Sequence, residues 1–164
     1  MLLQASLSLV VAMLIHELGH LLAARACRVP APELGLGWGP RAWGFRWGGV
    51  EFKLHALPVG AYVRFDVRAL QSRPLSQQVL VLLAGIVVNL CAAALWPGTI
   101  FGMMNLLLAA TNLLPFYQQD GWKCGIVMLR GLAGGRRSAL VEWTFTVAGA
   151  CASLALIAAQ VIRH

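Results

Sequence analysis

Hydrophobic residues dominate four long stretches of the chain, separated by shorter segments rich in polar residues and glycine. The stretches cover about residues 2–26, 76–95, 99–114 and 140–162. A helix needs about 20 apolar residues to cross the hydrocarbon core of a membrane. The third stretch is the shortest, and Pro115 ends it because proline breaks a helix. The pattern predicts an α-helical integral membrane protein with about four transmembrane helices.

The segment between the first two stretches has a different pattern. Residues 34–65 are rich in aromatic and β-branched residues, and "WGFRWGGVEFKLHAL" alternates partly on both sides of Gly48-Gly49. Such alternation around a glycine pair predicts a β-hairpin, and its tryptophans suit a membrane interface. A short interfacial helix is expected between Gln118 and Gly135. We interpret residues 1–164 as a single domain with this membrane-associated hairpin between the first two helices.

Composition and charge agree with a membrane location. The chain is 59% hydrophobic and 12% charged, whereas soluble domains are about half apolar and a quarter charged. The net charge of +7 comes from basic residues in the segments after the first and third stretches. The positive-inside rule places both segments in the cytoplasm and both termini outside. The charge therefore reflects topology and contact with the lipid bilayer, and no basic–aromatic module indicates a nucleic-acid partner.

Three ionisable residues interrupt the first apolar stretch, within "AMLIHELGHLLA". His16 and His20 are four residues apart, so they share one face of a helix. Glu17 completes the H-E-x-x-H pattern, in which two imidazoles bind zinc and the carboxylate acts on water. The histidines could instead bond backbone carbonyls or another helix. Ionisable groups inside lipid are costly, however, and the pattern favours a metal site in the cytoplasmic third of the membrane.

A catalytic zinc ion takes three protein ligands and keeps one position open, so a third ligand must come from elsewhere. Asp120 is the candidate that stands out, because it follows "TNLLPFYQQ" beyond Pro115, at the cytoplasmic end of the third stretch. The alternative is that Asp120 caps the following short helix. The other candidates are the cysteines and the remaining acidic and histidine residues: Glu33, Glu51, His55, Asp66, Glu142 and His164.

Four motifs in order resemble the site-2 protease family of intramembrane zinc metalloproteases. They are "HELGHLLAAR", "LPVGAYVRF", "LLAGIVVNL" and "NLLPFYQQDG", and together they cover most of residues 10–125. The chain is similar to a minimal bacterial-type member, and we expect no PDZ or CBS domain. "FYQQ" at residues 116–119 departs from the family pattern, which affects the expected shape of the substrate channel and not the ligand spacing.

The resemblance implies one zinc ion bound by His16, His20 and Asp120. It makes Glu17 the general base and then the proton donor. Asn89 and Asn112 match family asparagines near the catalytic centre, where they would contact the substrate backbone or its carbonyl. The alternative for both asparagines is hydrogen bonding between helices.

The resemblance also implies a substrate and a location. A transmembrane protein or peptide would unwind and add as a strand to the hairpin, with Asn89 and the hairpin residues Phe52, Lys53 and Leu54 binding it. The protein would be a multi-pass protein of a bacterial inner membrane, with its active site toward the cytoplasm. Two alternatives stay open: a zinc-binding membrane scaffold without proteolytic activity, and a metal transporter.

Overall fold

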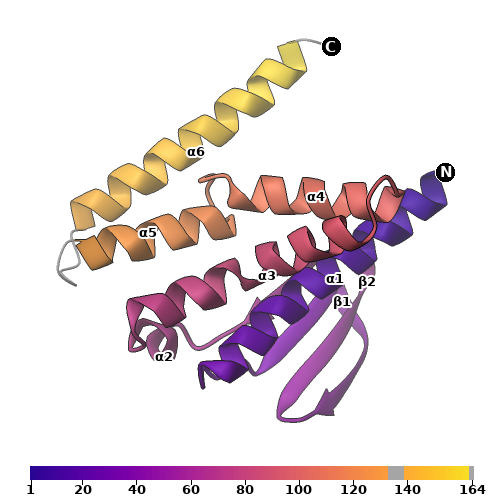
Figure 1. Cartoon of the computed structure of the whole chain (residues 1–164), viewed down its shortest axis with the longest axis horizontal. Coiled ribbons are helices and arrows are strands. Elements are labelled where there is room, and N and C mark those ends of the chain that lie inside the picture. Colours follow the sequence, from indigo (N-terminus) through magenta and orange to yellow (C-terminus); the bar gives the residue numbers. More distant parts are fainter. Residues whose placement is uncertain (133–138, 163–164) are drawn as a thin grey trace. The chain divides into compact units, whose positions relative to one another are not determined.

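Helices α1 (Leu2–Ala26) and α3 (Leu75–Leu95) pack against each other in the N-terminal part of the chain (Figure 1). The computed structural model describes residues 1–132 and 139–162. Gly19 explains the close packing, because a Cβ atom there would lie 2.9 Å from the carbonyl oxygen of Ala84. Small residues let two helix backbones approach in this way. The antiparallel pair is the scaffold on which the candidate site is built.

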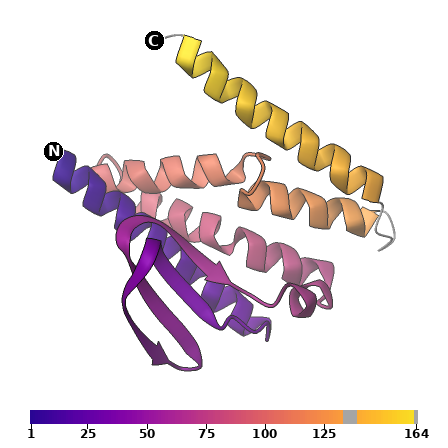
Figure 2. The ribbon, with the colours of Figure 1, turned by 180° about the vertical axis from the view of Figure 1, so that it is seen from behind.

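The expected β-hairpin is confirmed, with strands β1 (Glu33–Trp47) and β2 (Val50–Arg64). Gly48 and Gly49 form its two-residue turn with φ values of 57° and 82°. Positive φ at both positions is the requirement of a type I′ hairpin turn, which glycine meets without steric cost. Both strands contact α1, and Figure 2 shows the sheet lying against that helix.

The hairpin curls back on itself. Residues Glu33 to Leu36 pair with Arg64 to Ala61 in the antiparallel sense, and they also pair with Glu51 to Leu54 with both numbers rising together. Residues Glu51 to Leu54 are paired on their other side with Arg46 to Trp43. The turn therefore returns toward the start of β1. A backbone hydrogen bond of 2.8 Å from Glu51 N to Pro32 O joins the start of β2 to the residue before β1.

Two further helices complete this part of the chain. Helix α2 (Val67–Gln71) was not expected from the sequence. Its N-cap is Asp66, whose carboxylate accepts hydrogen bonds from the backbone N–H groups of Arg68 and Ala69. Helix α4 (Ile100–Leu113) corresponds to the third apolar stretch.

The chain divides into two compact units, Met1–Ala110 and Thr111–His164. The second unit contains α5 (Asp120–Leu132), the expected short helix, and α6 (Ala139–Ile162). Arg130 binds the Glu142 carboxylate with both Nε and Nη2, at 2.5 and 2.8 Å. Gly125 leaves room for the Phe145 ring, which would lie 2.7 Å from a Cβ atom at that position. These two contacts join α5 to α6.

Within residues 1–132 and 139–162, two helices are long and apolar enough to cross a membrane, α1 and α3. Helix α4 and the segment Leu140–Ala155 of α6 are shorter apolar helices among the described residues. At 1.5 Å per residue, the 14 residues of α4 span only about 21 Å. The prediction of a mostly helical protein with membrane-length helices is confirmed, and the third and fourth spans stay predictions.

Candidate metal centre

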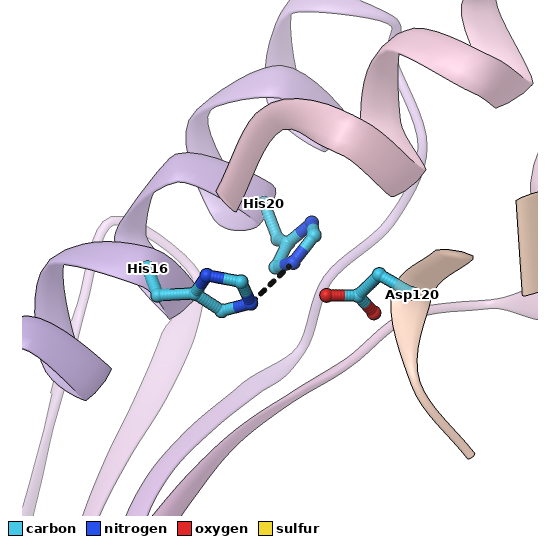
Figure 3. Close-up of side chains that lie close together, drawn as sticks. All are labelled: His16, His20 and Asp120. Carbon is cyan, nitrogen blue, oxygen red and sulfur yellow. Dashed lines mark hydrogen bonds between the residues drawn. The ribbon is translucent and has the colours of Figure 1, made fainter. Parts of the chain in front are cut away.

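His16 and His20 lie one turn apart on the face of α1 that packs against α3, and both are buried. Their rings meet edge to face with centroids 4.7 Å apart. The two Nε2 atoms are 3.1 Å from each other, as the dashed line in Figure 3 marks. The spacing of the two histidines in the sequence thus brings two potential ligand atoms together.

Helix α3 fixes the tautomer of both imidazoles, that is, which ring nitrogen carries the hydrogen. Nδ1 of His16 donates to Oδ1 of Asn89 at 2.5 Å, and Nδ1 of His20 donates to the carbonyl oxygen of Val81 at 2.7 Å. A neutral imidazole has one N–H group and one lone pair. Since Nδ1 carries the hydrogen in each ring, both Nε2 atoms present lone pairs, and these lone pairs face each other. A cation or an additional proton between them would relieve this repulsion.

The geometry fits zinc. Zn–N bonds of about 2.0–2.1 Å and tetrahedral angles keep two imidazole nitrogens about 3.3 Å apart, close to the 3.1 Å between these Nε2 atoms. Histidines that bind metals usually donate their other N–H to a carbonyl or carboxylate, which fixes the ring orientation. Both histidines of this pair have such an acceptor on α3. The residues present therefore fit a zinc ion.

Gly85 of α3 leaves the space that the two rings occupy. A Cβ atom at Gly85 would lie 2.5 Å from Nε2 of His20 and 2.8 Å from Nε2 of His16. Both distances are too short for non-bonded atoms, so a side chain here would displace the imidazoles. This role of Gly85 was not expected from the sequence, although Gly85 lies within the segment "LLAGIVVNL".

Asn89 is fully buried. Its Nδ2 donates to the Ala12 carbonyl oxygen at 3.1 Å and to Oδ1 of Asn105 at 2.6 Å. Asn105 is also fully buried, and its Nδ2 donates to the Phe101 carbonyl oxygen at 2.9 Å. Both amide hydrogens of Asn89 are thus engaged within the protein, and these contacts support a role in positioning His16. Asn105 was not expected from the sequence, where it is a polar residue in the third apolar stretch.

Glu17 follows His16 on α1 and is more exposed than the two histidines. Its side chain therefore keeps some contact with the surroundings of the protein. A general base needs such a position, because it must exchange protons during each catalytic cycle.

Asp120, the third side chain drawn in Figure 3, belongs to the second unit. It is buried and is the first residue of α5, and its Oδ1 accepts from Nζ of Lys123 at 2.9 Å. Gly121 allows a tight turn here, since a Cβ atom would lie 2.2 Å from the carbonyl oxygen of Leu113. Asn112, the other predicted residue of this unit, is half-buried near the end of α4.

The other acidic candidates for a third ligand have different partners. Glu33 accepts from Lys53 and Tyr62 at 2.8 and 2.5 Å. The remaining carboxylates bind Arg41 (Glu51), cap α2 (Asp66) or bind Arg130 (Glu142). His55 contacts Gly39 O and the Tyr62 hydroxyl, consistent with a structural role in the sheet. Asp120 also has a basic partner, Lys123, but among the described acidic candidates outside α1 only Asp120 and Glu33 are buried.

The predicted substrate-binding residues Phe52, Lys53 and Leu54 lie in the inner part of the curled sheet. Each has backbone neighbours on two sides, from the start of β1 and from its end. The outer segments of the described sheet are instead Trp43–Trp47 and Ala61–Arg64. A strand that adds to this sheet without displacing a segment would therefore meet one of those two edges, and Phe52–Leu54 could reach it only through their side chains.

A cluster of polar side chains connects three segments of the curled sheet. The hydrogen bond from Lys53, and then that from Tyr62, hold the pKa of Glu33 below its usual value. Burial, followed by the hydrogen bond to Glu33, raises the pKa of Tyr62 to about 12. Lys53 comes from the inner segment and Tyr62 from the outer segment of β2, so Glu33 links both to β1.

The fold and this pair define a class: a helical protein with membrane-length helices and, on one of them, a buried histidine pair whose geometry fits a metal ion. The model of peptidase family M50 matches residues 4–100, a range that includes the H-E-x-x-H motif and Asn89 and ends before Asp120. The chain therefore belongs to peptidase family M50, the family of site-2 proteases, and the resemblance seen in the sequence is confirmed.

Relatives carry names of the same kind. The chain is 33% identical over 97 residues to a predicted zinc metalloprotease of Nostoc sp., and this match covers 52% of this chain and 27% of that protein. It is 33% identical over 98 residues to one of Clostridium acetobutylicum, covering 55% and 29%. It is 34% identical over 103 residues to a predicted chloroplast membrane metalloprotease of Arabidopsis thaliana, covering 56% and 23%. The matched region is thus about a quarter of each relative's length.

Proposed function

We propose that this chain is a zinc metalloprotease that hydrolyses peptide bonds within or near transmembrane segments of membrane-anchored proteins. The observation that carries the proposal is the pair of Nε2 lone pairs held face to face on α1. Membership of family M50 and the names of the relatives support the same reaction.

Three side chains would hold the ion: His16, His20 and Asp120. Asp120 is proposed as third ligand because it is buried at the start of α5, in the segment that matches the family motif. When bound, zinc lowers the pKa of a water ligand toward 7 and polarises a carbonyl group.

Glu17 supplies the proton chemistry. Its carboxylate oxygen accepts a proton from the attacking water and then delivers that proton to the departing amide nitrogen. Asn89 keeps the Nδ1–H of His16 bonded, so that Nε2 stays a ligand throughout the cycle. Asn112 and the hairpin residues Phe52, Lys53 and Leu54 are proposed to contact the substrate backbone near the reacting bond.

The location is also part of the proposal. We infer a multi-pass protein of a bacterial inner membrane with the site open toward the cytoplasm, where the basic segments lie under the positive-inside rule. A water-filled path from that side would bring the second reactant, because lipid alone supplies no water.

The test uses a reporter with one transmembrane segment, co-expressed with the wild type or with Glu17→Gln, His16→Ala or Asp120→Ala. We expect Glu17→Gln to keep zinc and lose cleavage, while His16→Ala and Asp120→Ala lose both. His55→Ala and Asp66→Ala are the matched controls, since neither residue belongs to the proposed site, and both should retain zinc and cleavage. Zinc content is measured by elemental mass spectrometry and the cut site by peptide mapping.

Full cleavage by purified Glu17→Gln protein would refute its role as base, and zinc binding unchanged in Asp120→Ala would refute the third ligand. Zinc without cleavage of any transmembrane reporter would favour the scaffold alternative. Uptake of zinc into proteoliposomes would favour the transporter.

A further inference from the structure

A cavity of about 370 Å³ lies at the C-terminal end of α1, away from the histidine pair. Its walls are Arg25, Arg28, residues 29–32 and the hairpin turn with Val50. Arg25 donates a hydrogen bond from Nη2 to the carbonyl oxygen of Gly48, so the curled hairpin closes one side of the cavity. None of these residues has a role in the proposed proteolytic site.

Arg28 has a backbone conformation that is unusual for an arginine. Its φ is 55°, in the left-handed region that glycine or asparagine adopts more easily. The bonds Arg28 N to Arg25 O of 2.9 Å and Val29 N to Ala24 O of 2.8 Å form the helix-ending motif in which glycine is usual. A strained residue of this kind is a reason to look for function. Here the strained position directs an arginine to the cavity wall.

The charge around the cavity is positive and is not neutralised. No described carboxylate forms an ion pair with Arg25 or Arg28, since Glu33 and Glu51 bind Lys53, Arg41 and Arg64. Arg73 adds a third guanidinium, which donates from Nη2 to the Arg28 carbonyl oxygen at 2.6 Å. The Nε atom of Arg73 is buried and has no hydrogen-bond partner. Cations that line a concave site, as Arg25 and Arg28 do here, concentrate anions.

We propose that this cavity binds a phosphate-bearing anion between Arg25 and Arg28. The guanidinium fork matches phosphate oxygens in a bidentate manner. The source that fits best is the headgroup of an anionic phospholipid, because the cavity lies at the end of a helix long enough to cross a membrane. Exposed Trp43 and Trp47 on the adjacent hairpin are typical of the interfacial level. This site depends on insertion of α1 into a membrane and not on proteolysis.

The test titrates the Glu17→Gln protein in neutral detergent with dihexanoyl phosphatidylglycerol, dihexanoyl phosphatidylcholine or inorganic phosphate, and follows tryptophan fluorescence. We expect saturable binding of phosphatidylglycerol. Arg28→Asn removes the charge and tolerates the left-handed backbone, and it should weaken binding by at least about tenfold, as for a charge-assisted hydrogen bond. Arg68→Gln removes the same charge from an exposed position outside the cavity, and should cost about fivefold or less. Arg28→Lys should retain more affinity than Arg28→Asn.

Inorganic phosphate binding as tightly as phosphatidylglycerol would support the phosphate site and assign it to a soluble ligand. Equal losses of affinity in Arg28→Asn and Arg68→Gln would overturn the proposal. So would the absence of saturable binding of both phosphatidylglycerol and inorganic phosphate. Unchanged zinc content of Arg28→Asn verifies its fold. Pro30→Glu places a carboxylate in the cavity wall and leaves every arginine in the sequence. This variant should independently abolish binding.

Discussion

The hydrogen bond between Asn89 and His16 makes a sharp prediction about zinc affinity. Asn89→Ala removes the acceptor of the His16 Nδ1–H group and leaves the imidazole free to rotate or change tautomer. Loss of such a partner typically weakens metal binding by about 10–100-fold, which corresponds to about 1.4–2.7 kcal/mol. Asn89 is fully buried, so bulk water does not readily replace its oxygen, and we expect an effect in this range.

A matched variant separates metal positioning from general destabilisation. Asn89→Ala also leaves the buried Oδ1 of Asn105 without its donor, and an unsatisfied buried group costs about 1–3 kcal/mol of folding stability. Asn105→Ala breaks the same bond without touching His16. Both variants should therefore unfold more easily than the wild type, whereas only Asn89→Ala should weaken zinc binding by tenfold or more. Asn89→Asp restores an acceptor for His16 and should recover most of the affinity.

The assay is a competition titration against a chromophoric zinc chelator in neutral detergent, with thermal unfolding measured on the same samples. Zinc affinity of Asn89→Ala within about twofold of the wild type would refute the positioning role. Equal weakening in Asn105→Ala would show that the buried amide network as a whole, and not the bond to His16, supports the metal centre.

Two further predictions concern α3 and the sheet. Gly85→Ala should lower zinc affinity by at least about tenfold because its Cβ atom would collide with both Nε2 atoms, although alanine favours a helix by about 1 kcal/mol; zinc retained at wild-type affinity would contradict this steric account. Burial raises the pKa of Tyr62 to about 12 in the fold, from about 10 in the unfolded chain. The contribution of Tyr62 to stability is therefore complete below pH 10 and is lost as the pH rises to 12. Denaturant unfolding at pH 9 to 12 should show this loss in the wild type and a smaller one in Tyr62→Phe, and parallel pH profiles would disprove it.

Much of the fold could be predicted from the sequence because its periodicities are strong. The apolar stretches gave the positions of α1, α3 and α4 within a residue or two, and the glycine pair identified the hairpin turn. The curl of the hairpin could not be predicted, because pairing of Leu34 with both Phe52 and Val63 depends on contacts between segments distant in the chain. Helix α2 is only five residues long, too short for a periodic signal.

The candidate site shows the same division. The spacing of His16 and His20 identified the ligand pair, because four residues return a helix to the same face. The protonation of the two rings was not visible in the sequence, since it depends on acceptors from α3, including a backbone carbonyl that has no sequence signature. Asn89 was recognised from its motif, but its hydrogen bond to His16, which suggests a role in ligand orientation, was not visible in the sequence.

The spacing on α3 explains why the pair is stable in an apolar setting. Val81, Gly85 and Asn89 are four residues apart, like the two histidines, and therefore share the face that meets α1. Because the helices run antiparallel, Val81 lies opposite His20 and Asn89 opposite His16, with Gly85 providing space between them. One helix thus contributes two donors and two lone pairs, and the other contributes two acceptors and a gap. Two matching four-residue spacings, one on each helix, thus specify the histidine pair. Neither helix would position the imidazoles without the other.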